Sequence, residues 1–209
     1  MSETTTSQLL WCRHSGGKFP KKPPSICIID TNVFLGAIPE QSQLDTKQRQ
    51  CIEKCIAVVV MISKGHIKKI IADINETTGQ SEIMSEYFHN LQQHNVQGFA
   101  GKILKLLNDR NIIQYRPIAS HPRYEYVEFP QDERLNNFDP SDKKFIAVSL
   151  AASPHYPIIQ SMDGKWWRWS NALKDYGVEI LFTNPDYAKD SCKKKNRCNK
   201  TKCSDCNYE

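Results

Sequence analysis

A short apolar run that ends in an acid decides the fold of this chain: Ser25-Ile26-Cys27-Ile28-Ile29-Asp30. An apolar run without polar alternation is typical of a strand that is buried on both faces of a parallel sheet. An acid at the end of such a strand is costly unless it is paired. Asp30 is therefore the first candidate site residue.

Strands and helices alternate on the carboxyl side of this run. We expect helices over 45–62, 81–91, 97–109, 141–152 and 166–176, and strands over 67–73, 112–115, 157–161 and 178–182. This alternation predicts an α/β protein, a three-layer α/β/α sandwich with a central parallel sheet. Residues 116–138 show little periodicity and predict a long loop.

Charge divides the chain into an N-terminal arm (1–24), a central domain (25–186) and a basic Cys-rich tail (187–209). The arm carries four basic residues against one acid, the tail seven against three, and the total charge of +5 leaves −2 for the domain. An acidic centre between basic ends suits cations in a site and a polyanion at its rim. The alternative is that the basic ends are solubilising tails.

Length and composition exclude several classes of protein. The chain of 209 residues fits one ordinary domain plus some extra sequence, and 10% aromatic residues exclude a disordered chain. The longest apolar run, Cys55–Ile62, has eight residues, whereas a membrane-spanning helix needs about 20. Since the N-terminus also lacks the pattern of a secretory signal, we expect a soluble, cytoplasmic protein without a membrane partner.

Further acids stand near the ends of other predicted elements. Glu86 lies on the helix after the second strand, Asp139 and Asp142 open the helix before the fourth strand, and Asp163 follows that strand. Ligands of such sheets bind at the carboxyl ends of the strands. Acids that converge there repel one another unless a cation neutralises them, and an all-oxygen set suits Mg²⁺ or Mn²⁺.

Each acid also has a structural interpretation. Asp139 precedes a proline and is a good helix N-cap, and Asp142 would favour the helix dipole. Asp163 precedes a glycine and fits a simple turn. Asp73 is typical of a turn former and Glu82 of a solvated helix residue, although either of them could replace Glu86 in a site.

Four segments together resemble the PIN-domain nuclease family: Ile28–Leu35, Glu82–Tyr87, Phe138–Val148 and Ser161–Trp167. The resemblance covers about residues 25–183. It implies a three-layer fold and divalent-metal cleavage of RNA, sometimes of DNA. The family's quartet of catalytic, metal-binding acids falls on Asp30, Glu86, Asp142 and Asp163.

The resemblance also implies supporting residues. Asp139 matches an auxiliary metal-binding acid, and Thr31 and Asn32 match a polar position that follows the first acid. We expect Asn32 and Ser161 to orient water or phosphate. Exposed lysines at helix starts are usually just solvated, but two here could contact phosphates: Lys143 and Lys165.

One position departs from the family pattern. Many members carry a second acid two residues after the fourth, immediately before a tryptophan, and Lys165 stands there in this chain. A lysine at that position speaks against tight binding of a second metal ion. The sequence leaves open whether one or two cations bind.

The tail and the aromatic residues add weaker signals. Four cysteines could form a zinc site, or they could be free thiols of a flexible tail: Cys192, Cys198, Cys203 and Cys206. Trp166, Trp167 and Trp169 could stack on bases, although such residues more often pack in a core or at its rim.

We therefore expect a metal-dependent endonuclease that binds nucleic acid, RNA in preference to DNA, in the manner of a toxin or defence nuclease. A protein partner or a homo-oligomer is compatible with this interpretation. The alternative is a non-catalytic PIN-like scaffold that binds nucleic acid or protein. A haloacid-dehalogenase type phosphohydrolase fits less well, because it usually needs a second Asp where Asn32 stands.

Overall fold

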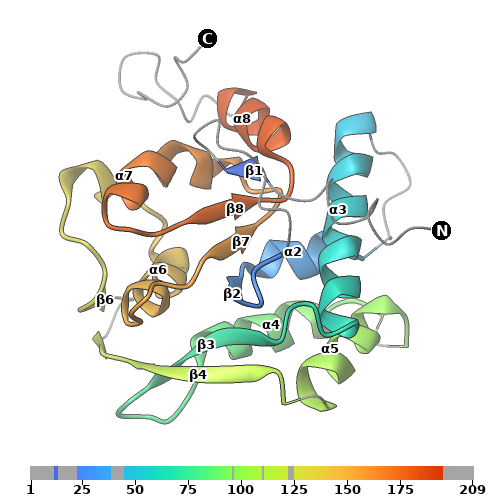
Figure 1. Ribbon diagram of the computed structural model, residues 1–209, viewed down its shortest axis with the longest axis horizontal. Helices are drawn as coiled ribbons and strands as arrows, with labels where there is room; N and C mark the ends of the chain where they lie inside the picture. The colour runs from blue at the N-terminus through green and yellow to red at the C-terminus, as the bar shows by residue number, and fades with distance from the viewer. Residues whose placement is uncertain are drawn as a thin grey trace.

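The computed structural model describes residues 12–13, 23–38, 45–95, 97–109, 111–121 and 125–194. A central sheet is flanked by helices (Figure 1). Its six strands lie in the order β1 (Cys12–Arg13), β8 (Ile180–Phe182), β7 (Ile158–Gln160), β2 (Ile26–Ile29), β3 (Lys69–Asn75) and β4 (Ile113–Ile118). Strands β8, β7, β2, β3 and β4 are all parallel, and β1 is antiparallel to β8. The predicted α/β class with a central parallel sheet is confirmed.

The apolar run that opens the domain forms the middle of the sheet. Cys27, Ile28 and Ile29 of β2 are fully buried between β3 and β7, as expected of a strand covered on both faces. The chain builds β3 and β4 on one side of β2 and then returns to add β7 and β8 on the other side. The strand order therefore reverses between β2 and β7, which is where ligands of such sheets bind.

Most of the helices occupy connections between strands, near the predicted ranges, but the first helix (Thr31–Gly36) and the last (Pro185–Lys194), which follows the last strand, were not predicted. The helices are α2 (Thr31–Gly36), α3 (Thr46–Ser63), α4 (Glu82–Gln92), α5 (Phe99–Asp109), α6 (Lys143–Leu150), α7 (Ser170–Asp175) and α8 (Pro185–Lys194). Their placement around the sheet is compatible with a three-layer sandwich (Figure 1). Within the ranges that the structure describes, none of the helices is both long and apolar enough to cross a membrane.

The interpretation of 116–138 as a long loop is wrong in part. Strand β4 continues to Ile118, β5 (Ser120–His121) pairs with β6 (Glu125–Tyr126), and a short helix η1 (Glu133–Leu135) follows. Two buried phenylalanines explain this order, because the Phe129 and Phe138 rings lie 5.5 Å apart and Phe138 packs 5.0 Å from Trp169. Such contacts between distant segments leave no periodic signal in the sequence.

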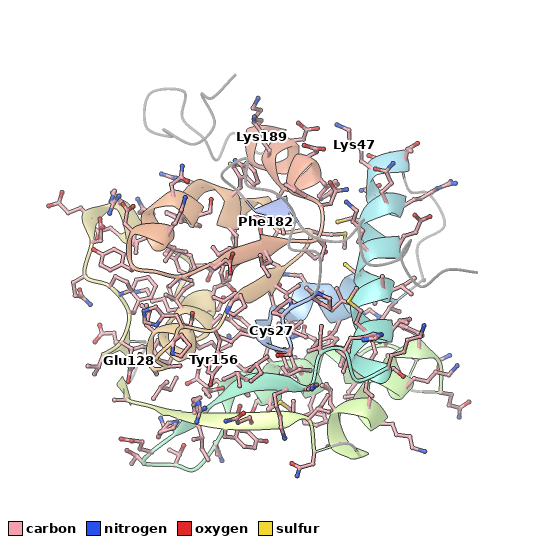
Figure 2. The ribbon with its side chains drawn as sticks, viewed as in Figure 1. Cys27, Lys47, Glu128, Tyr156, Phe182 and Lys189 are labelled. Atoms are coloured by element: carbon pink, nitrogen blue, oxygen red, sulfur yellow. The ribbon has the colours of Figure 1, made fainter. Side chains whose placement is uncertain are left out.

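Part of the N-terminal arm belongs to the sheet. Cys12 pairs with Phe182 and Arg13 with Leu181, so β1 adds an antiparallel edge strand beside β8. Phe182, the partner of Cys12, lies in the inner part of the molecule in Figure 2, whereas Lys47 of α3 and Lys189 of α8 lie at its outer end. Residues Cys12–Arg13 therefore pair along an edge that β8 would otherwise expose.

The three tryptophans that were candidates for base stacking are buried. They lie in the short helix η3 (Gly164–Trp169), and Trp166 is fully buried. Gly164 lets α8 approach this helix, because a Cβ there would lie 2.6 Å from the Cys192 backbone nitrogen. Trp166, Trp167 and Trp169 thus pack in the core and present no open face for bases.

Candidate active site

Asp30 lies at the carboxyl end of β2, where the strand order reverses. Its side chain caps α2, since Oδ1 accepts a hydrogen bond from the Asn32 amide at 2.9 Å, and the residue is only 1% exposed. Burial raises the pKa of Asp30 well above its ordinary value, and the nearby charges of Asp142, Glu86 and Asp163 raise it further. Acids from three other segments therefore act on this one carboxyl group.

Asp142 precedes β7 in the chain and Asp163 follows it. Asp142 ends the short helix η2 (Pro140–Asp142), and its Oδ2 accepts a hydrogen bond from Trp166 Nε1 at 3.1 Å. Burial raises the pKa of Asp142, while Lys165 acts against the rise. Asp163 caps η3 by accepting the Lys165 amide at 3.0 Å. Short helices on either side of β7 in the chain therefore hold both carboxylates.

Lys165 lies among three of the acids. Its Nζ is 2.5 Å from Asp139 Oδ2, 2.9 Å from Asp142 Oδ2 and 3.2 Å from Asp163 Oδ2. Although burial lowers the pKa of Lys165, Asp139 and Asp142 raise it above its ordinary value. The lysine that we expected to contact phosphate instead neutralises the acids as the structure stands.

Asp139 has the N-cap role that its position predicted, whereas its role as a metal-binding acid stays a prediction. It caps η2, because its Oδ1 accepts hydrogen bonds from the Ser141 amide and the Ser141 hydroxyl. The proline that follows Asp139 lies in the first turn of this helix. Burial raises its pKa, but hydrogen bonds from Lys165 and Ser141 outweigh this effect and lower it to about 2. Asp139 therefore stays ionised beside the other carboxylates.

Glu86 is held by two polar side chains. Thr31 Oγ1 donates to Glu86 Oε1 at 2.5 Å, and Lys144 Nζ lies 2.5 Å from Glu86 Oε2. Lys144 is only 3% exposed; its ammonium also donates to the Ser141 carbonyl and lies 4.9 Å from the centre of the Phe145 ring. Thr31 thus positions the acid, and Lys144 neutralises it.

Sequence reasoning missed Lys144, whose positive charge is buried in the site, whereas that of Lys165 is half-buried. A signal was available, because Lys144 shares a helix face with the fully buried Ala147 and Val148. We expected Lys143 to contact phosphate, but its Nζ lies 4.9 Å from the centre of the Phe129 ring.

Asp73 and Glu82, the two alternatives to Glu86, make structural hydrogen bonds. The buried Asp73 accepts hydrogen bonds of 2.8 Å from the Ser81 hydroxyl and from the amides of Glu82 and Ile83, so it secures the start of α4. Glu82 Oε2 accepts a hydrogen bond from the Tyr126 hydroxyl at 2.6 Å. Of the three candidates for the second acid, Glu86 is the one whose charge acts on Asp30.

Ser161 faces the thiols of α3. Its fully buried Oγ lies 2.8 Å from Cys55 Sγ, 3.6 Å from Cys51 Sγ and 3.2 Å from Thr183 Oγ1. The structure thus ties the end of β7 to α3 through this hydroxyl. Asn32 contributes its backbone amide to Asp30, as described above.

The four cysteines that could form a zinc site lie mostly outside the described residues. Cys192 is fully buried in α8, and the other three cysteines, Cys198, Cys203 and Cys206, are not among the residues described. Zinc binding by the tail therefore stays a prediction.

The chemistry of the acid set fits a hard divalent cation, since every donor is a carboxylate oxygen. Within the described ranges, however, no three acidic, histidine or cysteine side chains are arranged so that they could hold a metal ion. The ammonium groups of Lys144 and Lys165 lie among the carboxylates instead. A cation that binds here must displace or outcompete part of this internal neutralisation.

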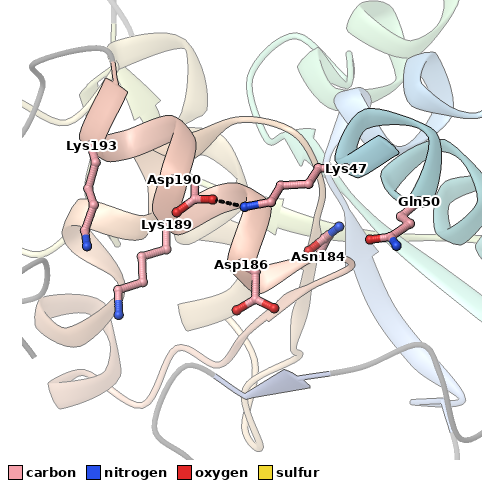
Figure 3. A pocket seen from close by; sticks show the side chains of 7 residues that line it. All are labelled: Lys47, Gln50, Asn184, Asp186, Lys189, Asp190 and Lys193. Atoms are coloured by element: carbon pink, nitrogen blue, oxygen red, sulfur yellow. Dashed lines mark hydrogen bonds and ion pairs between the residues drawn. The ribbon is translucent and has the colours of Figure 1, made fainter. Parts of the chain in front are cut away.

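A second polar region is a cleft between α3 and α8 with a volume of about 360 Å³. Figure 3 shows the ammonium of Lys47 directed at Asp190, with Asn184 and Gln50 nearby. Both partners are solvent-exposed, with 57% of the Lys47 side chain and 39% of the Asp190 side chain accessible. Charges of both signs line this cleft, so it has no strong preference for anions or cations.

Comparison with known proteins adds no assignment, because no family model, no curated protein and no solved structure matches the chain.

Proposed function

We propose that the chain is a divalent-metal-dependent nuclease of the PIN type, and that it acts as an endoribonuclease. The observation that carries the proposal is the position of Asp30, which is buried at the strand-order reversal and under the influence of Asp142, Glu86 and Asp163. A buried carboxylate among other acids is destabilised unless a positive charge compensates it. The motifs around these acids resemble the same family.

Each acid has a role in this proposal. Asp30, Asp142 and Asp163 would hold the cation, while Thr31 orients Glu86 through the hydrogen bond from its Oγ1. When bound, Mg²⁺ or Mn²⁺ would polarise a phosphoryl oxygen and lower the pKa of water for in-line attack. The short helices η2 and η3 hold Asp142 and Asp163, and a cation that binds between these two carboxylates would have to displace or outcompete Lys165.

The distribution of charge supports a polyanionic substrate. The arm and the tail are basic, whereas the domain between them carries a net charge of −2. Basic residues attract the phosphate backbone without regard to base sequence, and this attraction weakens as salt rises. RNA of broad sequence, held by the basic ends, is therefore the substrate class that we propose.

The test is cleavage of single-stranded RNA with Mn²⁺ or Mg²⁺ by the full chain and by Asp30→Asn. We expect the variant to lose activity by about a thousandfold or more, because a neutral amide is a poor cation ligand. Its fold should persist, since an asparagine oxygen can still cap α2. Asp175→Asn, at an exposed acid of α7, is the matched control and should cleave at the parental rate. An unchanged rate in Asp30→Asn would contradict the proposal.

A second candidate is a non-catalytic scaffold that binds nucleic acid. It is favoured by the ion pairs of Lys144 and Lys165, which neutralise the acids without a metal. The two candidates separate in one experiment, because a scaffold binds the RNA and leaves it intact at any concentration of Mn²⁺.

A further inference from the structure

Gln160, the last residue of β7, has a buried polar side chain whose amide is unpaired. The residue is fully buried, and among the described residues neither its Oε1 nor its Nε2 has a hydrogen-bond partner. Its backbone is paired in the ordinary way, because the Gln160 carbonyl accepts a hydrogen bond from the Thr183 amide at 2.8 Å. Burial of an unpaired amide costs free energy. A glutamine at this position therefore needs a reason other than stability.

The sheet places Gln160 beside Asp30. Ile159 of β7 pairs with Ile29 of β2, and the Asp30 amide continues this ladder by donating to the Ile159 carbonyl at 2.9 Å. Asp30 and Gln160 are the next residues along the two strands, so they are neighbours in register on one face of the sheet. Successive side chains alternate between faces, and Gln160 therefore lies on the face opposite to Ser161, whose hydroxyl contacts the thiols of α3.

Asp30 is the acid of the site that such an amide suits. Its Oδ1 accepts a hydrogen bond from the Asn32 amide at 2.9 Å. The ammonium groups of Lys144 and Lys165, in contrast, pair with the other acids of the site. A carboxylate can accept several hydrogen bonds, and the Nε2 of a glutamine is a donor only. The unpaired donor of Gln160 thus lies next to a carboxylate that has acceptor capacity left.

We propose that Gln160 is a positioning residue of the candidate active site, whose Nε2 donates to the Asp30 carboxylate when substrate is bound and fixes the orientation of that carboxylate. This inference rests on the proposed function. Gln160 acts through Asp30 and makes no contact with substrate, because both of its polar atoms are buried. An amide that stays unpaired until substrate binds destabilises the free protein, which is a common cost of functional groups.

The experiment compares the parent with Gln160→Met, which keeps the length of the side chain and removes both polar atoms. Ile158→Met, at a fully buried residue on the same face of β7, is the matched control. In cleavage of single-stranded RNA with Mn²⁺, we expect Gln160→Met to lower kcat by about tenfold or more and to leave KM unchanged, because the lost hydrogen bond goes to a charged group. Ile158→Met should keep the kcat of the parent.

Thermal unfolding of the metal-free proteins supplies a second readout. We expect the melting temperature of Gln160→Met to exceed that of the parent, because an apolar group replaces a buried, unpaired amide. A residue with a purely structural role would give the opposite result, a lower melting temperature with an unchanged kcat.

The outcomes distinguish this inference from the proposed function. An unchanged kcat in Gln160→Met, or an equal loss in Ile158→Met, would overturn the role of Gln160 and leave the nuclease proposal standing. A lower melting temperature of Gln160→Met, or its failure to fold, would show that the amide stabilises the free protein and would overturn the inference as well. A parent that leaves RNA intact would overturn both.

Discussion

Two regions of the molecule pair lysines with carboxylates in different surroundings. One is the cleft between α3 and α8, and the other is the acid centre at the ends of β2 and β7, which consists of five acids and two lysines: Asp30, Glu86, Asp139, Asp142, Asp163, Lys144 and Lys165. In the acid centre, the Lys144 side chain is 4% exposed and pairs with Glu86. In the cleft, the Lys47 side chain is 57% exposed and pairs with Asp190. Both are lysine–carboxylate pairs between elements far apart in the sequence, and they differ chiefly in burial.

Burial decides what each pair does. Two charges interact far more strongly when they are removed from water, but each one must first lose its hydration. In the cleft, water and salt screen the pair, and long side chains lose freedom when they form it. Repulsion between poorly hydrated carboxylates, which a cation could reduce, is therefore a property of the acid centre. The cleft is a solvated surface where such repulsion is weak.

The largest effect on stability is expected from Lys144→Met. The substitution keeps the apolar stem and leaves Glu86 without its ammonium partner. We expect the free energy of unfolding to fall by about 2 kcal/mol, less than when one partner of a fully buried pair is removed, because the Glu86 side chain is 27% exposed. Chemical denaturation of the metal-free protein measures this change.

The double variant Lys144→Met with Glu86→Gln sharpens the same comparison. Because it removes both charges, we expect it to recover most of the lost stability. Equal losses in the single and double variants would show that packing of the lysine stem matters, and that the ion pair does not.

An intermediate effect of opposite sign is expected from Asp30→Asn in the absence of metal. The pKa of Asp30 is raised in the fold, so its protonated form is favoured there. Its contribution to stability is therefore present below the ordinary pKa near 3.8 and is lost as pH rises through the raised value. At pH 7 the variant should therefore be more stable than the metal-free parent.

Denaturation at several pH values checks this prediction. The gain should shrink toward zero near pH 4, where Asp30 of the parent is protonated, and saturating Mn²⁺ should stabilise the parent more than the variant. A gain that does not vary with pH would point to better packing of the amide and would remove the electrostatic explanation.

The smallest effect is expected in the cleft. Lys47→Met breaks the exposed pair with Asp190, and we expect the melting temperature to stay within about 2 °C of that of the parent, because exposed pairs contribute little. Raising the salt concentration should reduce even this difference. A loss as large as that of Lys144→Met would show that exposure is a poor guide to the strength of these pairs.

The central strand and several of the site acids could be predicted from local pattern. The run Ile26–Ile29 is apolar on both faces, and Asp30 follows it directly. Asp139 precedes a proline, which indicates a helix start. Each of these signals consists of residues that are neighbours in the chain, so it can be recognised from the sequence alone.

The defined structure of residues 116–138 and the ion pairs of the site lysines could not be predicted in the same way. Phe129 packs against Phe138, and Phe138 packs against Trp166 and Trp169 of η3. Lys144 and Lys165 find their carboxylates only when separate elements come together. Local periodicity carries no information about such distances.

The sequence by itself determined the alternation of strands and helices and the acids that stand at their ends, because backbone preferences and hydrophobic periodicity act over a few residues. Only the tertiary structure decided which charges became neighbours. The energy of a buried charge depends on every group within a few ångströms, wherever that group lies along the chain.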